Sequence, residues 1–360
     1  MRIVHALAQP AQRSVDGCSN SVWTLATAQA ALGHEVCVVL TVAVGPAAPH
    51  ASGLWLVGWS DRAALGRVRS WADVLHLHSV FSPRLVWVQA VLAGATPVVA
   101  APHGGLAAPI LARRRARKRV YGVAVERRRL RAADLLIALT SAEAADLERY
   151  LGPRRPTIEV VPNPIAPAPI RVPVPRQPGR VVYLGRFDVL HKGLDRLAAV
   201  ARHSRAEYHL YGPAGPGRTD SLPALEAANL VVHGPVFGAA KTAVLDGAAA
   251  YVQPSRWEAF GCSLAEAAMA GTPLVVSVGC DLAAEVVRNG CGIAVDFEQA
   301  GPAAVALDRL LSSESDRERA AMGQRAAEWA VRSFAAPAVA QRMVEMYEAL
   351  LAGSGHRSRR

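Results

Sequence analysis

The segment PSRWEAFGCSLAEAAMAG, residues 254–271, places two carboxylates, Glu258 and Glu266, around a Phe-Gly turn and a serine. Carboxylates accept hydrogen bonds from paired hydroxyl groups, so both could hold one ligand. A local alternative is equally open. Ser263 and Glu266 fit a capping box, which would close a helix beginning at Cys262 or Ser263. The segment by itself leaves both interpretations standing.

A second polar cluster occurs in YLGRFDVLHKGLDRL, residues 183–197, where Arg186 and Lys192 lie between an expected strand and an expected helix. Ligands of open parallel sheets bind beyond the carboxyl ends of the strands. Arginine offers a planar fork and lysine a point charge, a combination that suits a diphosphate. Each charge-assisted hydrogen bond contributes about 1.5–3 kcal/mol. The alternative is a solvated loop with two surface cations.

Two further positions follow expected strands. His103 precedes two glycines in VAAPHGGL, and Gly17 lies in AQRSVDGCSNS before an expected helix. Glycine permits close backbone approach to a ligand, and a helix N-terminus attracts anions. In HLH, His76 and His78 would share one face of a strand. Because no third ligand is evident, we interpret this pair as structural rather than metal-binding.

Short apolar runs alternate with helical patterns, which indicates parallel sheets covered by helices on both faces. The strands expected in the first half are Ile3–Leu7, Glu35–Leu40, Leu54–Val57, Asp73–Leu77, Pro97–Ala101, Leu135–Leu139 and Ile158–Val161. Residues 162–179, PNPIAPAPIRVPVPRQPG, contain seven prolines and predict an extended linker.

The alternation restarts after the linker. The expected strands are Val181–Leu184, Tyr208–Tyr211, Leu230–His233, Ala249–Gln253, Pro273–Val276 and Gly292–Val295, followed by helices through Ala303–Leu311, Asp316–Ser333 and Ala338–Leu351. Two similar α/β halves predict a cleft between them as the ligand site.

Bulk properties narrow the class. The chain has 360 residues, which favours two domains, and five cysteines without CxxC spacing, which are typical of reduced thiols in a cytoplasmic protein. No signal peptide or transmembrane helix is expected, so the protein should be soluble or peripheral to a membrane. A net charge of +11 favours an anionic partner.

Taken together, these segments are similar to the retaining glycosyltransferases of family 4, which have the GT-B fold. The resemblance covers nearly the whole chain and is carried by VDGCSNSVWTLATAQAALGHEV, DVLHLHSVF, APHGGL, RAADLLIALTSAEAADL, VVPNPI, YLGRFDVLHKGLD, YHLYGPAGPG, VVHGPV, PSRWEAFGCSLAEAAMAGTPLVVS and NGCGI. The spacing of Glu258 and Glu266, E-x7-E, is a hallmark of this family when GR…KG precedes it.

The resemblance implies an α/β fold of two Rossmann-like doubly wound domains facing a cleft. It implies the following boundaries: an N-terminal acceptor-side domain at 1–162, a linker at 163–179, a nucleotide-sugar-binding domain at 180–335, and a last helix at 336–352 that crosses back to the first domain. The implied reaction transfers a hexosyl or N-acetylhexosaminyl group from a nucleotide diphosphate sugar to an acceptor hydroxyl, in glycan, glycolipid or natural-product biosynthesis.

The resemblance also implies roles for individual residues. Arg186 and Lys192 would bind the donor's diphosphate, Glu266 the nucleotide ribose, and Glu258 the donor sugar hydroxyls. The remaining implied donor contacts are His103 at the sugar, Gly17 near the diphosphate and acceptor, and the backbone amides around Phe260, Gly261 and Cys262. No cofactor is implied, and because the sequence has no D-x-D we expect no metal.

Some positions depart from the family pattern. Ala259 and Cys262 stand where EGFGL is common, Cys18 follows Gly17 where a second glycine is common, and PNPI replaces PNG. These differences leave the class intact and blur the choice of sugar and acceptor. The mechanism implied by the family is front-face attack, with the leaving phosphate taking the acceptor proton.

The arginine-rich segment 113–131 is open to two interpretations. One is a membrane-surface patch for a lipid-linked acceptor. The other, which we favour, is a basic helix whose inner face is Val120, Val123, Ala124 and Leu130. A nucleotide-sugar epimerase or phosphorylase-like enzyme is the enzymatic alternative. The non-enzymatic alternative is nucleic-acid binding through Arg113–Arg119, and the lack of interleaved aromatic residues counts against it.

Overall fold

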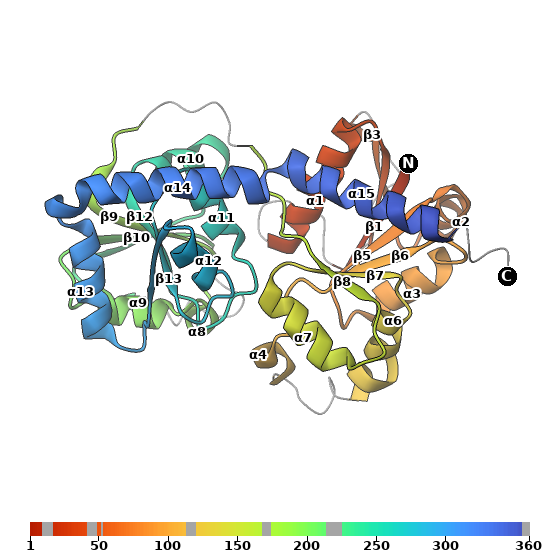
Figure 1. Ribbon diagram of the computed structural model, residues 1–360, viewed down its shortest axis with the longest axis horizontal. Coiled ribbons are helices and arrows are strands. Elements are labelled where there is room, and N and C mark those ends of the chain that lie inside the picture. The colour runs from red at the N-terminus through yellow and green to blue at the C-terminus, as the bar shows by residue number, and fades with distance from the viewer. Residues whose placement is uncertain are drawn as a thin grey trace. The chain divides into compact units, whose positions relative to one another are not determined.

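The computed structural model spans residues 1–360 and describes all of them except 9–16, 42–48, 52, 113–119, 168–173, 214–224 and 355–360. The chain divides into two compact units. Unit 1 comprises Met1–Pro164 and Ala336–Arg360, and unit 2 comprises Ile165–Ala335. Each unit contains a mainly parallel sheet with helices packed on it (Figure 1).

The described part of unit 1 forms an eight-stranded sheet in the order β3-β4-β2-β1-β5-β6-β7-β8. Its strands are β1 (Arg2–Leu7), β2 (Glu35–Leu40), β3 (Pro49–Ala51), β4 (Leu54–Gly58), β5 (Val74–His78), β6 (Val98–Ala101), β7 (Leu135–Ala138) and β8 (Thr157–Val160). All pairings are parallel except β3 with β4. The strand order reverses between β1 and β5, so ligands are expected near the carboxyl ends of these two strands.

Helices cover both faces of this sheet. They are α1 (Gly17–Ala31), α2 (Arg62–Trp71), α3 (Pro83–Leu92), α4 (Ala108–Ala112), the π-helix η1 (Gly122–Glu126), α6 (Arg127–Arg131), α7 (Ser141–Leu151) and α15 (Ala336–Ser354). Helix α15 packs beside α1, and Met343 and Tyr347 join the same hydrophobic cluster as Val22 and Leu25 (Figure 1). The last helix of the chain therefore belongs to the core of unit 1.

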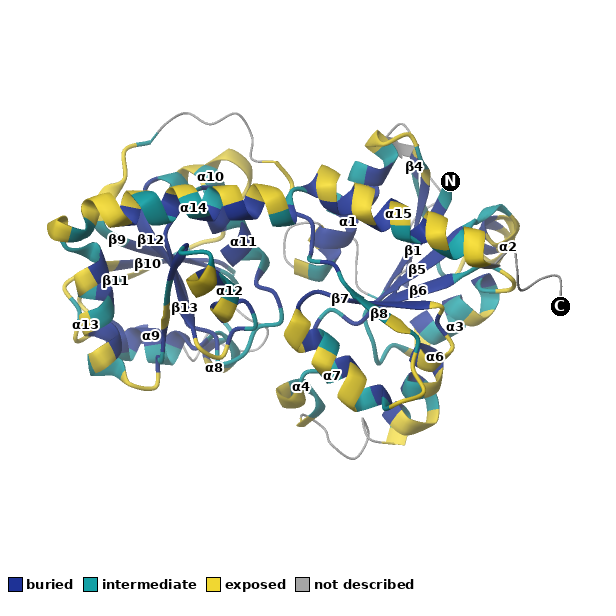
Figure 2. Cartoon of the chain, viewed as in Figure 1, coloured by how far each residue is buried: buried dark blue, intermediate teal, exposed yellow. Residues whose placement is uncertain are grey.

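The described part of unit 2 forms a six-stranded parallel sheet in the order β11-β10-β9-β12-β13-β14. Its strands are β9 (Gln177–Leu184), β10 (Glu207–Tyr211), β11 (Leu230–His233), β12 (Ala248–Gln253), β13 (Leu274–Ser277) and β14 (Gly292–Val295). Strands β12 and β13 and the second half of β9, Val181–Leu184, are buried, as Figure 2 shows, because helices lie on both faces. Here the order reverses between β9 and β12.

The helices of unit 2 follow its strands in turn. They are α8 (Val189–Lys192), α9 (Leu194–Ala201), α10 (Gly238–Asp246), α11 (Cys262–Met269), α12 (Ala283–Arg288), α13 (Ala300–Leu311), the 3₁₀ turn η3 (Ser313–Ser315) and α14 (Asp316–Phe334). The hydrophobic core contains Leu197 of α9, Tyr183 of β9 and Leu307 of α13. Strand–helix alternation thus places the loops after β9 and β12 at the middle of one sheet edge.

The expected strands are all present, and β2, β11 and β14 have the predicted bounds. The antiparallel strand β3 was not predicted, because PHA carries no apolar alternation. None of the five cysteines forms a disulfide bond. Within the described ranges, no helix is both long and apolar enough to cross a membrane.

The predicted inner face of the basic helix is confirmed at Leu130, which is buried, and was wrong at Val120, Val123 and Ala124. Val120 and Val123 are 71% and 56% exposed, whereas Glu126 and Arg129 are buried as an ion pair. The Glu126 carboxylate accepts a hydrogen bond from the Phe81 amide, and Arg129 donates to the Ser79 carbonyl. Periodicity assigns charged residues to the outside, so it missed a buried pair whose hydrogen bonds are satisfied. Arg113–Arg119 lies outside the described residues.

Candidate active site

The site predicted from the two polar segments lies at the topological switch point of unit 2. Strands β9 and β12 are parallel neighbours, and their carboxyl ends lead into the loops that carry Arg186 and Glu258. Residues far apart in sequence therefore meet at one sheet edge, where ligands of open α/β sheets bind.

A close backbone contact locks these loops together. A Cβ atom on Gly193 would lie 2.1 Å from the Pro254 carbonyl oxygen, and Gly193 has a left-handed φ of +65°. Only glycine fits this position without displacing the loop after β12. The Arg256 guanidinium reinforces the contact by donating to both carboxylate oxygens of Asp195, at 2.8 and 2.7 Å.

Lys192 and Glu258 form an ion pair between the two locked loops. Their side chains are only 15% and 16% exposed. The Glu258 carboxylate also accepts hydrogen bonds from Gln253 at 3.2 Å and from Ser255 at 3.3 Å. Burial alone would raise the pKa of Glu258, but the Lys192 ammonium, with a hydrogen bond from Ser255, outweighs burial and holds this pKa below its usual value. Glu258 is therefore an ionised acceptor at neutral pH.

His191 stays neutral beside this ion pair. Its ring stacks on Trp257 with centroids 3.8 Å apart, and its Nε2–H donates to the Trp257 carbonyl at 3.1 Å. Burial and the adjacent Lys192 lower the pKa of His191 to about 4. Among Glu258, His191 and Lys192, the only positive charge at neutral pH is therefore that of Lys192.

The start of α11 differs from the capping-box alternative. Gly261, with a φ of +72°, is the residue before the helix and provides no side-chain cap. The Ser263 hydroxyl instead lies 2.8 Å from the Tyr251 hydroxyl. Phe260 is buried and packs edge-on against Phe334, which fixes the turn before Cys262. The helix amides are thus not closed off by Ser263.

Glu266 is paired with a residue that the sequence did not suggest. Lys241 of α10 donates to Glu266 Oε1 at 2.6 Å, and the two side chains are 30% and 18% exposed. Arg186 contrasts with this arrangement. Over the described ranges its side chain has no hydrogen-bond or ion-pair partner, while its carbonyl accepts a hydrogen bond from Tyr183 at 3.0 Å. Arg186 therefore has a fixed backbone and an uncommitted guanidinium.

The two remaining predicted residues belong to unit 1. His103 follows β6 with a φ of +52°, which is strained for a residue other than glycine, and its Nε2 lies 2.9 Å from His78 Nδ1. The Gly104 amide donates to Glu143 at 2.5 Å and holds this turn. Gly17 is the first residue of α1, and residues 9–16 before it lie outside the described ranges.

The structure thus brings Arg186, Lys192, Glu258, Gly261 and Glu266 to one edge of unit 2. Sequence reasoning missed Lys241, His191 and the Arg256–Asp195 pair. The latter two fall inside the quoted motifs, but their contact depends on the crossover between loops, which spacing does not reveal. In the described part of the chain, the one group of three potential metal ligands lies in unit 1, away from these residues in the sequence.

Comparison with known families agrees with this geometry. Residues 15–169 match Glycosyltransferase Family 4, and residues 171–329 match Glycosyl transferases group 1. These two matches meet close to the boundary between the two units.

Individual relatives span most of the chain. Phosphatidyl-myo-inositol mannosyltransferase of Mycobacterium leprae is 30% identical over 79% of this chain and 77% of its own length. D-inositol 3-phosphate glycosyltransferase of Xylanimonas cellulosilytica is 29% identical over 79% of this chain and 74% of its own.

Solved structures share the fold at lower identity. Sucrose-phosphate synthase from Thermosynechococcus elongatus has a TM-score of 0.79 at 20% identity, covering 98% of this chain and 100% of that one. The Anabaena protein HepE, in complex with UDP and glucose, has a TM-score of 0.74 at 16% identity, covering 97% and 100%. From the family matches, the relatives and the two parallel α/β units, the chain belongs to the GT-B glycosyltransferases of family 4, glycosyl transferases group 1.

Proposed function

We propose that the protein is a retaining glycosyltransferase that moves a hexosyl or N-acetylhexosaminyl group from a nucleoside diphosphate sugar to an acceptor hydroxyl. One observation carries the proposal. The loop bearing Arg186 and Lys192 is locked by Gly193 onto the loop that bears Glu258 and leads into α11. Cations, an ionised carboxylate and helix amides therefore share one sheet edge, and no metal is needed for the transfer.

Each of these groups has a place on the donor. Arg186 and Lys192 bind the diphosphate, together with the backbone amides around Phe260, Gly261 and Cys262. The Lys192 ammonium has three N–H donors, so it can bind a phosphate oxygen while it keeps its bond to Glu258. Glu258 accepts hydrogen bonds from donor sugar hydroxyls, and Glu266 accepts them from the ribose.

The chemistry follows from the charge that develops on the leaving group. When the bond between the anomeric carbon and the phosphate oxygen breaks, Arg186, Lys192 and the α11 amides stabilise the departing diphosphate. The acceptor oxygen attacks from the same face and forms the new glycosidic bond, and its proton passes to the leaving phosphate oxygen. Glu258 is ionised and paired with Lys192, so its role is to orient the sugar.

We further propose that His103 contacts the donor sugar and that Gly17 lies near the diphosphate and acceptor. The strained φ of His103 and its bond to His78 support a fixed, functional position. The relatives support the substrate class. HepE was solved with UDP and glucose, and the names of two relatives point to inositol-containing acceptors.

Mass spectrometry tests this proposal. Purified protein is incubated with UDP-, GDP- or TDP-sugars and a panel of hydroxyl acceptors, in EDTA. We expect one acceptor to gain the mass of one sugar, with NMR showing that the anomeric configuration of the donor is retained. An epimerase would change the donor and leave every acceptor unmodified, and inversion or dependence on added metal would refute the mechanism.

The control variants separate chemistry from folding. Glu266→Ala and Lys192→Ala should abolish transfer while the protein stays folded. Arg325→Ala removes a guanidinium that is 40% exposed and paired with Glu318, and should leave transfer unchanged. Full activity in the first two variants would contradict the proposed site.

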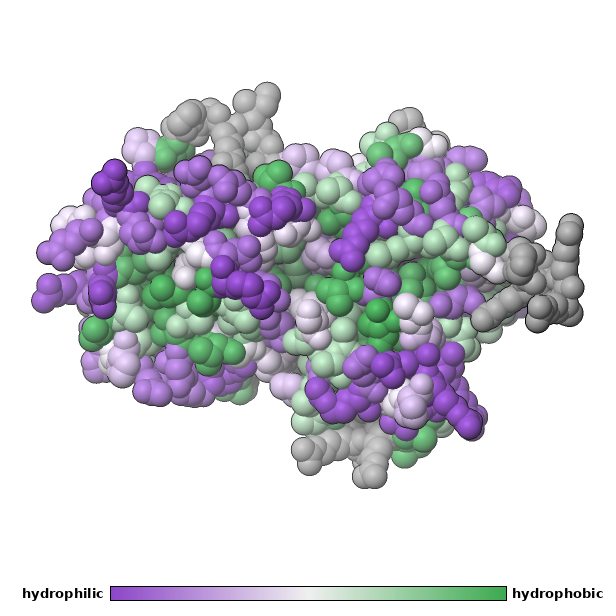
Figure 3. Space-filling model, viewed as in Figure 1, coloured by the Kyte–Doolittle hydropathy of each residue, from purple (hydrophilic) through white to green (hydrophobic). Residues whose placement is uncertain are grey.

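A specific observation also favours contact of residues 120–131 with an anionic membrane surface, the interpretation that the sequence pattern did not favour. Val120 and Val123 are exposed, and hydrophilic side chains gather over α6 and α7 nearby in the sequence (Figure 3). Apolar side chains flanked by arginines suit an interface with acidic headgroups. Vesicles of acidic phospholipid should co-sediment with the wild-type protein but not with the double variant Val120→Ser/Val123→Ser. Equal co-sedimentation of the wild type and the variant would exclude this surface.

A further inference from the structure

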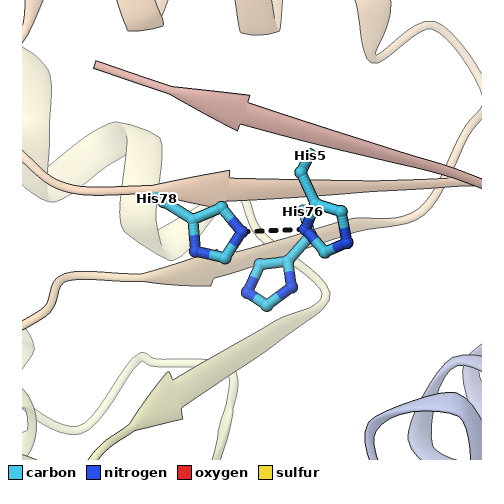
Figure 4. A group of neighbouring side chains, drawn as sticks. All are labelled: His5, His76 and His78. Atoms are coloured by element: carbon cyan, nitrogen blue, oxygen red, sulfur yellow. Dashed lines mark hydrogen bonds between the residues drawn. The ribbon is translucent and has the colours of Figure 1, made fainter. Parts of the chain in front are cut away.

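Three buried histidines meet at the switch point of unit 1. His5 comes from β1, and His76 and His78 come from the adjacent strand β5 (Figure 4). They are 0%, 1% and 1% exposed, and one ring nitrogen of each lies within 4.8 Å of the others. His5 is therefore a third candidate ligand beside His76 and His78. His5 was not recognised from the sequence, because it lies far from the other two histidines, in the first strand, in the run RIVHAL.

The three rings offer nitrogen ligands in a buried setting. An imidazole ring presents one nitrogen lone pair when its other nitrogen carries the proton. Neutral imidazole nitrogens are common ligands of zinc, copper and nickel.

Each ring is also held by an outer partner. His5 Nε2 lies 2.7 Å from Gln29 Oε1, His76 Nδ1 lies 2.7 Å from the Tyr347 hydroxyl, and His78 Nδ1 lies 2.9 Å from His103 Nε2. Metal-binding histidines are oriented by such a bond on the nitrogen that does not face the ion. The inner nitrogens of His5 and His78 are 2.9 Å apart, as the dashed line in Figure 4 shows.

His76 supplies the second observation. Its Nε2 is buried and has no hydrogen-bond partner in the described part of the chain. A buried polar nitrogen without a partner costs free energy, so a ligand at this nitrogen is favoured. A cavity of about 20 Å³ adjoins His76 and His78, and one water molecule needs about 10–15 Å³.

We propose that His5, His76 and His78 bind one divalent late first-row transition-metal ion, with a water molecule from this cavity as the fourth ligand. Three histidines and a water are a known tetrahedral zinc site. Bond lengths of about 2.0–2.1 Å place ligand nitrogens about 3.3 Å apart, so the His5–His78 pair opens slightly when the ion binds. The proton between these two nitrogens moves to His78 Nδ1, which then donates to His103 Nε2, and the proton of His103 moves from its Nε2 to its Nδ1.

This site adjoins the proposed transfer chemistry, because His78 contacts His103, but the transfer itself is proposed to need no metal. An ion that binds the folded unit and not the unfolded chain raises the melting temperature of the unit. Because His76 contacts Tyr347 of α15, the ion also connects this helix to the sheet. The site thus has a readout that does not depend on activity.

The test uses untagged full-length protein freed of metal by chelation and dialysis. Calorimetric titration with Zn²⁺ should show one ion per chain, and Co²⁺ should give the strong visible bands of a tetrahedral site. His76→Phe and His78→Phe should each lose at least about 100-fold in Zn²⁺ affinity. Tyr347→Phe removes only a hydroxyl from the outer partners, and should lose about 10- to 100-fold.

A second histidine pair provides the matched control. His209 and His233 of unit 2 lie 3.0 Å apart but lack a third ligand in the described part of the chain. His209→Ala should bind Zn²⁺ as the wild type does. The proposal is overturned if the wild type binds no stoichiometric ion, or if His209→Ala loses binding as His76→Phe does. Should His76→Phe fail to fold, unchanged affinity in folded Tyr347→Phe would also overturn it.

Discussion

Replacing Lys192 by methionine tests whether Glu258 is an ionised carboxylate held by one cation. The variant keeps the length of the side chain and removes its charge, and it leaves Glu258 with neutral donors from Gln253 and Ser255. Breaking a fully buried ion pair costs about 3–5 kcal/mol, and an exposed pair contributes at most about 1 kcal/mol. With side chains 15% and 16% exposed, we expect a loss of about 2–3 kcal/mol at neutral pH.

The sign of the pH dependence makes the prediction specific. In the wild type the pKa of Glu258 is depressed, so this group adds stability above its unfolded pKa and loses it as the pH falls. In Lys192→Met the main cause of the depression is gone, and burial should raise the pKa of Glu258 instead. The variant then regains relative stability as the pH falls from 7.5 to 5, because its carboxyl becomes neutral.

Scanning calorimetry measures both effects. For a unit of this size, 2–3 kcal/mol corresponds to a melting temperature about 4–12 °C lower at pH 7.5, and the difference should shrink at pH 5. Adding Glu258→Gln to Lys192→Met should restore part of the loss, since no buried charge is left unpaired. Equal melting temperatures at pH 7.5, or a difference that does not change with pH, would refute this description of the ion pair.

Three further predictions follow from the same unit. Gly193→Ala should lower the free energy of unfolding by about 2 kcal/mol or more in calorimetry, because its Cβ would meet the Pro254 carbonyl. Gly66→Ala, with nothing within 4 Å of its Cβ, should be neutral or slightly stabilising, and equal effects of the two variants would contradict the loop contact. Lys241→Met should weaken binding of ribonucleoside diphosphates about 2- to 10-fold in calorimetric titrations, because Lys241 positions Glu266. Binding of 2′,3′-dideoxy analogues should not change, and an equal loss of affinity for both kinds of nucleotide would exclude that role of Lys241. His191→Phe should make the melting temperature less sensitive to a change from pH 7 to pH 5. The reason is that a histidine whose folded pKa is lowered to about 4 lowers stability as the pH falls, because only the unfolded state takes up a proton. An unchanged dependence of the melting temperature on pH would show that His191 is not buried in its neutral form.

Most of the fold could be predicted because parallel strands that are buried on both faces appear in the sequence as unbroken apolar runs. The run EVCVVL therefore marks β2 with its correct bounds. The short edge strand β3 has no such run and was missed. In the helical segment after Val120, the buried Glu126–Arg129 pair was missed because it looks like surface charge in a periodic pattern.

The site was predictable in its residues but not in its contacts. Arg186, Lys192 and Glu258 were recognised from their loops, yet the bond between Lys192 and Glu258 depends on the pairing of β9 with β12. The pairing of Glu266 with Lys241 replaces the expected capping box because Ser263 is held by Tyr251. Such contacts arise from tertiary packing, which no local spacing specifies.

Binding of nucleoside diphosphates by unit 2 is the most direct test of the account. Calorimetric titration of the wild type, Arg186→Met, Lys192→Met and Arg325→Met with UDP, GDP and TDP, in EDTA, measures the contribution of each cation. The account predicts one site per chain for at least one nucleotide, with affinity about 10- to 150-fold lower in Arg186→Met and in Lys192→Met and unchanged in Arg325→Met. Binding that is absent in the wild type, or equal in all four proteins, would contradict it.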